Sequence, residues 1–259
     1  MGRVQDAVVD KTSRPPLTFE ERLKRAFVPP GLELRRIFAR ERRKGEYGLR
    51  LLPELVDPHR LAIDIGANRG IWAHEMAVLC PCVWAFEPNP KLFDFLRRAA
   101  GPRVVCHAIA LSDEEGETEL MVPGADGRYS NQGASLNPGK IAGAAHMRVT
   151  VSMASLDALD PAPVGFMKID VEGHEHEVLE GARGVIARDR PVMIIEIEER
   201  HTGIDLDTAL DFVESLGYTT QAITGRSVID RAALEVDRDH RGRAGEAGYV
   251  NNFIFRPAA

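Results

Sequence analysis

The densest group of residues able to do acid–base chemistry is the segment Lys168-Ile-Asp-Val-Glu-Gly-His-Glu175. It continues an apolar run that predicts a buried strand at 165–170, so its charges gather at the carboxyl end of that strand. Crowding ionisable groups there costs stability through desolvation and like-charge repulsion, which indicates a functional role. Asp170 could orient a reacting group, and Glu172, His174 and the later Glu196 are candidates for a general base. Histidine titrates near neutral pH, which suits this role, but His174 could also simply begin a helix.

A further carboxylate, Glu196, ends the apolar run Pro191–Glu196, which predicts the next strand. Parallel strands end at the same edge of a sheet, so Glu196 is expected to emerge near Asp170. Two neighbouring carboxylates could orient a hydroxyl group, raise each other's pKa or hold a metal ion. His201 has weaker support, and Glu175 is expected on the surface of the helix that follows 165–170.

The turn Asp64-Ile-Gly-Ala-Asn-Arg-Gly70 follows the first expected strand, Leu61–Ile65, and leads into a helix. Glycines let the backbone turn sharply and approach a ligand, and a helix N-terminus favours an anionic group. The spacing does not fit the dinucleotide fingerprint, because Asn68 and Ile71 occupy glycine positions, and no Walker A ending is present. The Asp64 carboxylate either helps to organise a bound ligand or caps backbone N–H groups.

Glu87 and the turn Ala110-Leu-Ser-Asp113 follow the next two expected strands. Glu87 lies 21 residues after Gly66, and an acid at about this distance beyond a glycine-rich turn typically binds the ribose hydroxyl groups of a nucleotide. The turn at 110–113 would lie beside the base of that nucleotide, or it is an ordinary turn between strands. These positions predict a nucleotide-like cofactor at the carboxyl ends of the strands.

The elements that must position these residues alternate between strands and helices after His59. Seven strands are expected, at 61–65, 82–86, 104–108, 165–170, 191–196, 218–223 and 252–255. This alternation predicts an α/β fold in which helices cover both faces of a mainly parallel sheet, with ligands bound at the carboxyl ends of the strands. Residues 1–56 are expected to form an N-terminal helical extension, and residues 57–259 the main domain.

A further pair of strands is expected at Glu117–Val122 and Arg148–Met153. Between them, the segment from Gly124 to Gly143 is rich in Gly, Asn and Ser. Loops of this length in compact domains are usually functional or disordered. We expect either a disordered insertion or a lid over the acceptor, which would carry Ser130, Asn131, Gln132 and Ser135.

Composition and charge disfavour several classes of protein. Hydrophobic residues make up 44% of the 259 residues, so a full core can form, and no apolar run is long enough to span a membrane. The three cysteines make a poor disulfide framework and no secretory signal is evident, so a cytoplasmic location is expected. Nucleic acid is not an expected partner, because the net charge is −6 and no nucleic-acid motif is present.

The charge is unevenly distributed along the chain. Residues 21–50 hold ten Lys or Arg and four Asp or Glu, a local charge of +6 that leaves −12 on the rest. A basic arm of this kind could contact an anionic substrate or a membrane surface. It could equally be the solvated face of helices that pack through interleaved apolar residues, namely Leu23, Phe27, Leu32, Leu34, Ile37 and Phe38.

Together, these motifs resemble those of FkbM-type S-adenosylmethionine-dependent methyltransferases. The shared pieces are Asp64–Gly70, Phe86-Glu-Pro-Asn89, Ala110–Asp113, Ser155-Leu-Asp157 and Lys168–Glu175 with the following Leu-Glu-Gly-Ala. They cover about residues 60–200, and the last piece is the most specific. In the methyltransferase turn pattern Asp-x-Gly-x-Gly-x-Gly, Asn68 stands in place of the middle glycine. The resemblance implies a Rossmann-like class I methyltransferase fold, with a seven-stranded, mainly parallel sheet whose last strand is antiparallel.

The resemblance also implies S-adenosylmethionine as cofactor and O-methylation of a small natural product or sugar. Expected cofactor-binding residues are Asp64, Gly66, Ala67, Asn68, Gly70, Glu87, Pro88, Ala110, Ser112 and Asp170. Expected catalytic residues are Asp170, Glu172, His174 and Glu196, and no metal site is expected. The alternatives are a metal-assisted O-methyltransferase with Asp170, Glu172 or Glu196 as ligands, an NAD-dependent oxidoreductase and a non-catalytic protein that keeps the nucleotide fold. The acceptor, and whether the chain forms a homo-oligomer, stay open.

Overall fold

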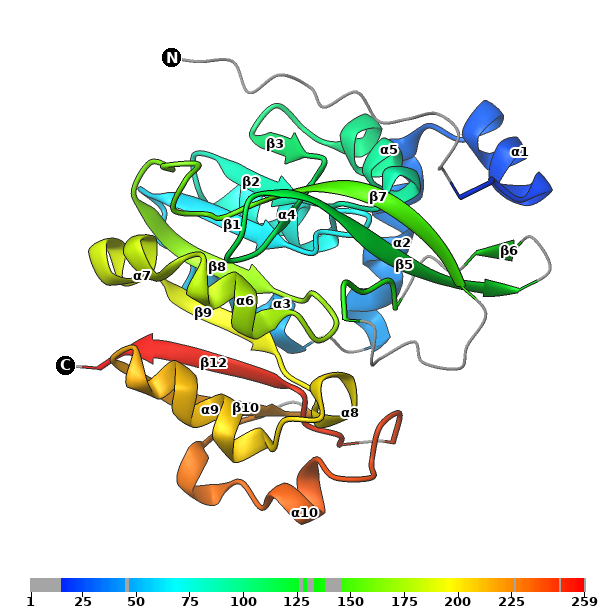
Figure 1. Cartoon of the computed structure of the whole chain (residues 1–259). Coiled ribbons are helices and arrows are strands. Elements are labelled where there is room, and N and C mark those ends of the chain that lie inside the picture. The colour runs from blue at the N-terminus through cyan, green and yellow to red at the C-terminus, as the bar shows by residue number, and fades with distance from the viewer. Residues whose placement is uncertain are drawn as a thin grey trace.

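The structure of the protein is a computed structural model that describes residues 15–44, 47–125, 128–129, 133–137, 146–225, 227–246 and 248–258. A large central sheet carries helices on both faces, and a smaller sheet lies beside it (Figure 1). The helices are α1 (Phe19–Phe27), α2 (Pro30–Lys44), α3 (Tyr47–Leu55), α4 (Ile71–Leu79), α5 (Pro90–Ala99), α6 (Glu175–Glu180), α7 (Arg183–Asp189), α8 (Glu199–Thr202), α9 (Leu206–Ser215) and α10 (Val236–Asp239).

The central sheet has the strand order β11-β10-β12-β9-β8-β1-β2-β3. Its strands are β1 (Leu61–Ile65), β2 (Val83–Phe86), β3 (Val104–His107), β8 (Val164–Ile169), β9 (Val192–Glu196), β10 (Tyr218–Thr224), β11 (Ser227–Asp230) and β12 (Asn252–Pro257). Strands β1, β2, β3, β8 and β9 run parallel, whereas β12 is antiparallel to both neighbours, β9 and β10. The predicted α/β fold, with a mainly parallel sheet and an antiparallel last strand, is confirmed.

The predicted number of strands is wrong by one, because this sheet has eight strands. The additional strand is β11, which forms a hairpin with β10 at the edge of the sheet. Its four residues are half-buried or exposed. Since only Val228 and Ile229 are apolar in this short strand, the sequence shows no alternation from which a strand could be predicted.

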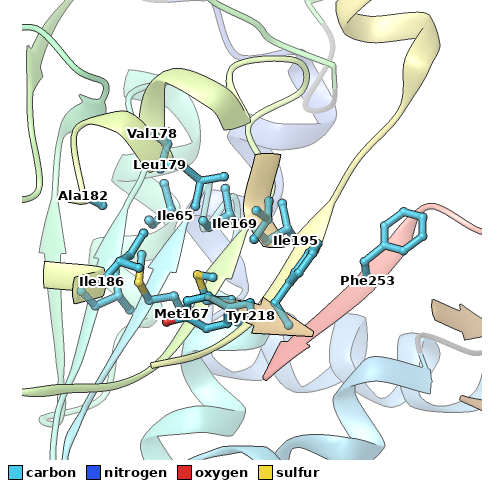
Figure 2. Close-up of a cluster of buried hydrophobic side chains, with 14 of the residues drawn as sticks. Ile65, Met167, Ile169, Val178, Leu179, Ala182, Ile186, Ile195, Tyr218 and Phe253 are labelled. Carbon is cyan, nitrogen blue, oxygen red and sulfur yellow. The ribbon is translucent and has the colours of Figure 1, made fainter. Parts of the chain in front are cut away.

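Helices cover the two faces of the central sheet over two apolar clusters. On one face, α6, α7 and α9 pack on a cluster that includes Met167 and Ile195, and Figure 2 shows side chains of this cluster. On the other face, α3, α4 and α5 cover Phe166 and Ile194. Successive strand residues point to opposite faces, so β8 and β9 are apolar on both sides because both faces are covered.

The smaller sheet has the order β4-β7-β5-β6 and lies between the third and fourth parallel strands in sequence. It contains β4 (Ile109–Leu111), β5 (Gly116–Ala125), β6 (Arg128–Tyr129) and β7 (His146–Ala154). The two extra strands predicted at 117–122 and 148–153 correspond to β5 and β7, which pair antiparallel from Gly116 with Met153 to Pro123 with His146. Alternate residues such as Leu120, Val122, Val149 and Val151 form a separate apolar cluster beneath this sheet.

The helices before β1 differ in how closely they join the domain. Helix α3 belongs to the core, since Leu49 and Leu52 lie in the same cluster as Phe166, and a Cβ on Gly48 would lie 2.7 Å from Trp72 of α4. Helix α1, by contrast, has no buried residue among its nine described residues. The domain boundary at residue 56 stays a prediction. No helix in the part of the chain that the structure describes is long and apolar enough to cross a membrane.

Candidate active site

The glycine-rich turn after β1 brings that strand against the end of β8. Gly66 has a φ of +81°, and a Cβ added to it would lie 1.8 Å from the backbone oxygen of Asp170. Gly70, with a φ of +83°, precedes α4 and would place a Cβ 2.5 Å from Leu96. Both positions therefore require glycine. Asn68 also has a positive φ, of 52°, and asparagine tolerates this conformation better than most residues, which explains how it occupies the middle position.

Asp64 contacts the start of the helix that follows this turn. Its buried carboxylate accepts a hydrogen bond from the backbone N–H of Ala73 at 2.9 Å. Ala73 lies in the first turn of α4, where N–H groups have no partner within the helix. Asp64 thus fixes the start of α4 against β1, so its capping role, one of the two that we considered, has a direct structural basis.

Glu87 connects the end of β2 to the glycine-rich turn. Its Oε2 accepts a hydrogen bond from the N–H of Asn68 at 2.7 Å, and its Oε1 accepts one from the N–H of Asn89 at 2.8 Å. Burial raises the pKa of Glu87 to about 7, against the opposing effect of these two donors. Near neutral pH, Glu87 is therefore poised between its protonated and ionised forms.

The turn at 110–113 packs against the segment that follows β8. His174 Nε2 lies 2.9 Å from Ser112 Oγ, and the Ser112 hydroxyl is 3.0 Å from Asp113 Oδ1. Burial lowers the pKa of His174, although the nearby carboxylates of Glu177 and Asp113 raise it in part. A Cβ on Gly181 would lie only 1.9 Å from the backbone oxygen of Ser112. The turn and the Leu-Glu-Gly-Ala piece are thus in direct backbone contact.

Lys168 supplies a buried positive charge beneath the end of β8. Its ammonium group lies 3.8 Å from Asp170 Oδ2, 3.5 Å from Asn252 Oδ1 and 5.4 Å from the ring centre of Trp72, and it donates to the backbone oxygen of Ile169 at 3.2 Å. A buried ammonium needs such partners to offset its desolvation. Lys168 therefore helps to hold the Asp170 carboxylate at the end of the strand.

Residues 133–137 lie across the loop that follows β8. Ser135 Oγ donates to the backbone oxygen of Glu172 at 2.7 Å, and Asn137 Nδ2 donates to the backbone oxygen of His201 at 3.0 Å. Glu172 has a φ of 59° and Gly173 a φ of 98°, so this loop adopts a backbone that costs energy for Glu172 and is held by its neighbours. The other predicted lid residues, Ser130, Asn131 and Gln132, lie outside the described residues.

Glu175 is buried, so its expected place on the helix surface is wrong. Its Oε1 accepts a hydrogen bond from the N–H of Gly173 at 3.0 Å, and burial raises its pKa to about 7. Helix α6 begins at this residue, and its Val178 and Leu179 pack in the same cluster as Ile169 of β8. The sequence pattern predicts the helix but not the burial of its first residue.

Glu196 ends β9 but does not line the pocket of the site. Its Oε1 accepts a hydrogen bond from Asn251 Nδ2 at 2.8 Å. Burial and the Asp170 carboxylate raise its pKa to about 9, against the opposing effect of Lys168. Glu196 is therefore a neutral carboxylic acid near pH 7, because Lys168 does not offset the combined effect of burial and the Asp170 charge.

Two further residues of the site, Glu198 and His201, received little or no weight in the sequence analysis. Glu198 is buried, and its carboxylate receives hydrogen bonds from Arg200, Tyr249 and Asn251. Burial raises the pKa of Glu198, but Arg200, His201 and Asn251 outweigh this effect and lower it to about 2. His201 Nδ1 lies 3.4 Å from Glu172 Oε2, and its Nε2 lies 3.8 Å from Glu198 Oε2. No spacing pattern distinguished this histidine, because its partner Glu172 lies in the distant loop after β8.

An open pocket connects most of these residues. Eight of the predicted site residues line it: Gly66, Asn68, Glu87, Pro88, Ala110, Asp170, Glu172 and His174. Asp64, Ala67, Gly70, Ser112 and Glu196 lie outside its described lining. Apolar side chains that the sequence analysis did not assign complete the walls, among them Leu92, Ile109, Leu111, Leu120 and Leu136.

Comparison with known proteins decides the family. The model of the methyltransferase FkbM domain matches residues 64–220, more than half of the chain. This chain belongs to the FkbM methyltransferase family. The predicted family is thus confirmed. The match begins at Asp64 and includes every predicted catalytic and cofactor-binding residue.

Individual relatives of this FkbM methyltransferase are more distant. The hexuronic acid methyltransferase AglP of Haloferax volcanii is 31% identical over 175 residues, which span 61% of this chain and 62% of that relative. The crystal structure of a methyltransferase FkbM from Methylobacillus flagellatus KT has a TM-score of 0.47 and 16% identity, and covers 80% of this chain and 50% of that one. A putative methyltransferase from Streptococcus mutans in complex with SAH has a TM-score of 0.46 and 10% identity, over 82% and 96%.

Membership of the FkbM methyltransferase family points to S-adenosylmethionine as the cofactor, and the described pocket suits its chemistry. Three carboxylates line the pocket, Glu87, Asp170 and Glu172, and no Lys or Arg is among its described lining residues. The cofactor carries a sulfonium and an ammonium group, so acidic walls suit its positive charges. Apolar side chains such as Leu92 and Leu111 suit the adenine ring.

A metal-assisted mechanism, one of the alternatives, requires a group of ligands that can hold the ion. In the residues that the structure describes, no group of three or more His, Cys, Asp or Glu side chains is arranged to hold a metal ion. Asp170 instead lies beside the Lys168 ammonium, and Glu196 hydrogen-bonds to Asn251. Metal dependence stays a question for a chelator experiment.

Proposed function

We propose that this FkbM-family methyltransferase transfers the methyl group of S-adenosylmethionine to a hydroxyl group of a sugar-containing or other small acceptor. One observation carries the proposal: Glu87, at the end of β2, and Glu172 and His174, after β8, line the same pocket. The first position suits the ribose of the cofactor, and the other two can face an acceptor. Cofactor and acceptor would therefore meet at the carboxyl edge of the sheet.

The cofactor would lie along the first half of this edge. Glu87 would accept hydrogen bonds from the ribose hydroxyl groups, with the turn residues Gly66 and Asn68 against the methionine part. Pro88 and Ala110 would contact the adenine, and Asp170 would face the positively charged end. The remaining predicted cofactor residues would not contact the cofactor. They would hold the turns at 64–70 and 110–113 in place, and they are Asp64, Ala67, Gly70 and Ser112.

The acceptor hydroxyl would be activated from the other half of the pocket. Methyl transfer requires the oxygen, the methyl carbon and the sulfur nearly in line, and such positioning can contribute roughly 7–11 kcal/mol. A base must remove the hydroxyl proton as attack proceeds, which typically contributes about 10²–10⁴-fold in rate. Glu172 and His174 line the pocket and are the proposed candidates. Glu196, whose pKa of about 9 keeps it protonated at neutral pH, would orient its neighbours.

Two considerations support a sugar hydroxyl as the acceptor. AglP, a relative at 31% identity, is a hexuronic acid methyltransferase. A hydroxyl group is also a poor nucleophile that needs a nearby base, and two candidate bases lie in one wall of the pocket. The alternative, metal-assisted O-methylation, predicts that a chelator abolishes turnover.

The first experiment is calorimetric titration with S-adenosylhomocysteine, using NADH as the control ligand. We expect micromolar binding of the former, loss of at least tenfold in affinity in Glu87→Ala and no binding of NADH. Glucuronic acid glycosides and neutral glycosides would then be incubated with methyl-labelled S-adenosylmethionine, with and without a chelator. An O-methyl signal in the product NMR spectrum would support the proposal. Failure of S-adenosylhomocysteine to bind, or transfer to nitrogen or carbon, would overturn it.

A further inference from the structure

Helix α1 presents its apolar side to solvent. Phe19, Leu23 and Phe27 follow one another at intervals of four residues, which places them on one side of a helix. Their exposed fractions are 77%, 43% and 78%. A helix that packs on its own domain normally turns its apolar side inward. Helix α1 therefore has the opposite orientation, with its apolar side turned away from the domain.

The contacts of α1 show that its charged side holds it to the domain. Glu21 Oε1 lies 2.8 Å from Lys91 Nζ, and an Arg25 guanidinium nitrogen lies 3.1 Å from Asp94 Oδ2, both at α5. At 3.6 residues per turn, Glu21 and Arg25 lie about 160–200° around the helix from the centre of the apolar side, at Leu23. Ion pairs thus fix α1 with its apolar side outward (Figure 1 shows α1 beside α5).

The start of α1 is also well defined. Thr18 and Glu21 form a reciprocal capping box, with the Thr18 N–H donating to Glu21 Oε2 at 2.8 Å and the Glu21 N–H donating to Thr18 Oγ1 at 3.3 Å. A capping box stabilises the first turn of a short helix. The exposed apolar side chains therefore lie on a helix whose first turn is stabilised by its own sequence.

Charge distinguishes between the partners that could cover this side. Residues 21–50 carry a charge of +6 and the rest of the chain −12, and Arg22, Arg35 and Arg36 are exposed. A second copy meeting the first through this face would bring two basic segments together, which is unfavourable. A surface of anionic lipids attracts the basic segment, repels the acidic remainder and accepts apolar side chains.

We infer that α1 docks reversibly on a membrane surface that contains anionic lipids. Phe19, Leu23 and Phe27 enter the boundary between head groups and acyl chains, and the neighbouring arginines contact lipid phosphates. Helix α5, which holds α1, also contributes Leu92 to the wall of the candidate active site. Docking therefore brings the pocket close to the membrane surface.

The test is sedimentation of the full chain with vesicles. We expect binding to mixed phosphatidylcholine and phosphatidylglycerol vesicles, weaker binding to pure phosphatidylcholine and weakening by salt. The double variant Phe19→Ser/Phe27→Ser should lose at least about tenfold in affinity. Val78→Ser is the matched control, because Val78 is 69% exposed on α4, elsewhere on the surface. Circular dichroism checks that each variant is folded.

A second measurement locates the contact. A tryptophan introduced by Phe27→Trp should be quenched by brominated lipid in anionic vesicles, and one introduced by Val78→Trp should not, each against the native background. The inference is overturned if the wild type does not bind anionic vesicles, or if the double variant binds as the wild type does. It is also overturned if analytical ultracentrifugation shows a dimer that the double variant dissolves while vesicles stay unbound, since α1 would then join two copies.

Discussion

Glu172 Oε2 lies 3.4 Å from His201 Nδ1, and the opposite nitrogen of the same ring lies 3.8 Å from Glu198 Oε2. The three side chains form a line from the pocket wall into the interior, joining the loop after β8 to the segment after β9. Glu198, with a pKa of about 2, is ionised at neutral pH. A proton accepted by Glu172 could therefore be shared with His201 and stabilised by the buried carboxylate.

This relationship predicts different outcomes for two substitutions. Glu172→Gln removes the proposed base with little change in shape, so kcat should fall by about 10²–10⁴-fold, while S-adenosylhomocysteine affinity stays within about twofold. His201→Gln should lower kcat by a smaller factor, because His201 acts through Glu172. Both are measured by steady-state kinetics on the best acceptor found.

The same assay separates the two candidate bases. If His174→Ala loses as much activity as we expect of Glu172→Gln, and Glu172→Gln keeps full turnover, then His174 is the base. That result would assign Glu172 a structural role, in which its backbone oxygen accepts the Ser135 hydroxyl.

The alternation of apolar strands with helices was sufficient to predict a mainly parallel sheet covered by helices, and it placed the candidate site at the carboxyl ends of the strands. Positions fixed by local chemistry were also predictable. Asn89, for example, caps α5 through a hydrogen bond to the N–H of Lys91, and Gly66 requires a positive φ. In each case the evidence lies within a few residues of the position concerned.

What could not be predicted depends on packing between distant segments. Glu175 looked exposed because a charged residue at a helix start usually is, but the folded chain buries it. His201 became part of the site through Glu172 and Asn137, which belong to two other parts of the chain, and through Glu198, three residues before it. No periodicity in one sequence records such contacts.

Glu87 predicts how cofactor affinity depends on pH. Its pKa of about 7 in the free protein exceeds the ordinary value, and ribose hydroxyl groups donate to the ionised form. Binding should therefore release a proton, and affinity should rise with pH below about 7 and level off above it. We expect S-adenosylhomocysteine to bind roughly tenfold more tightly at pH 8 than at pH 6, by calorimetry. Glu87→Gln should bind weakly with no such dependence, and an equal dependence in that variant would assign it to another group.

Substitution of Gly181, which is not among the described residues that line the pocket, should strongly lower stability. A Cβ there would lie 1.9 Å from the backbone oxygen of Ser112, in a contact between two backbones that has no flexible side chain to yield. Gly181→Ala should therefore lower the free energy of unfolding by about 3 kcal/mol or more. Gly101→Ala is the matched control, because nothing lies within 4 Å of its added Cβ. Equal urea midpoints for the two variants would show that the turn at 110–113 does not need this close approach.

Glu175 predicts that the protein becomes less stable as the pH rises. Its pKa is about 7 in the folded protein, above the ordinary 4.5. Between these values the unfolded chain has lost the proton that the folded protein keeps, so the contribution of Glu175 to stability falls with pH through this window and stays low above it. Glu175→Gln has no charge to bury and keeps an oxygen for the Gly173 N–H. Relative to wild type, this variant should gain up to about 3 kcal/mol in unfolding free energy between pH 4.5 and pH 8.

Urea unfolding at several pH values measures this gain. Glu180→Gln, on the same helix, serves as the control, because Glu180 pairs with Arg183 at the surface and its pKa is lowered. Its stabilising effect is present above the ordinary pKa and is lost as the pH falls, so the control should show no gain at high pH. If Glu175→Gln and wild type differ by the same amount at every pH, the Glu175 side chain titrates alike in the folded and unfolded states. Its hydrogen bond to the Gly173 N–H would then be strong enough to offset the cost of burying the charge.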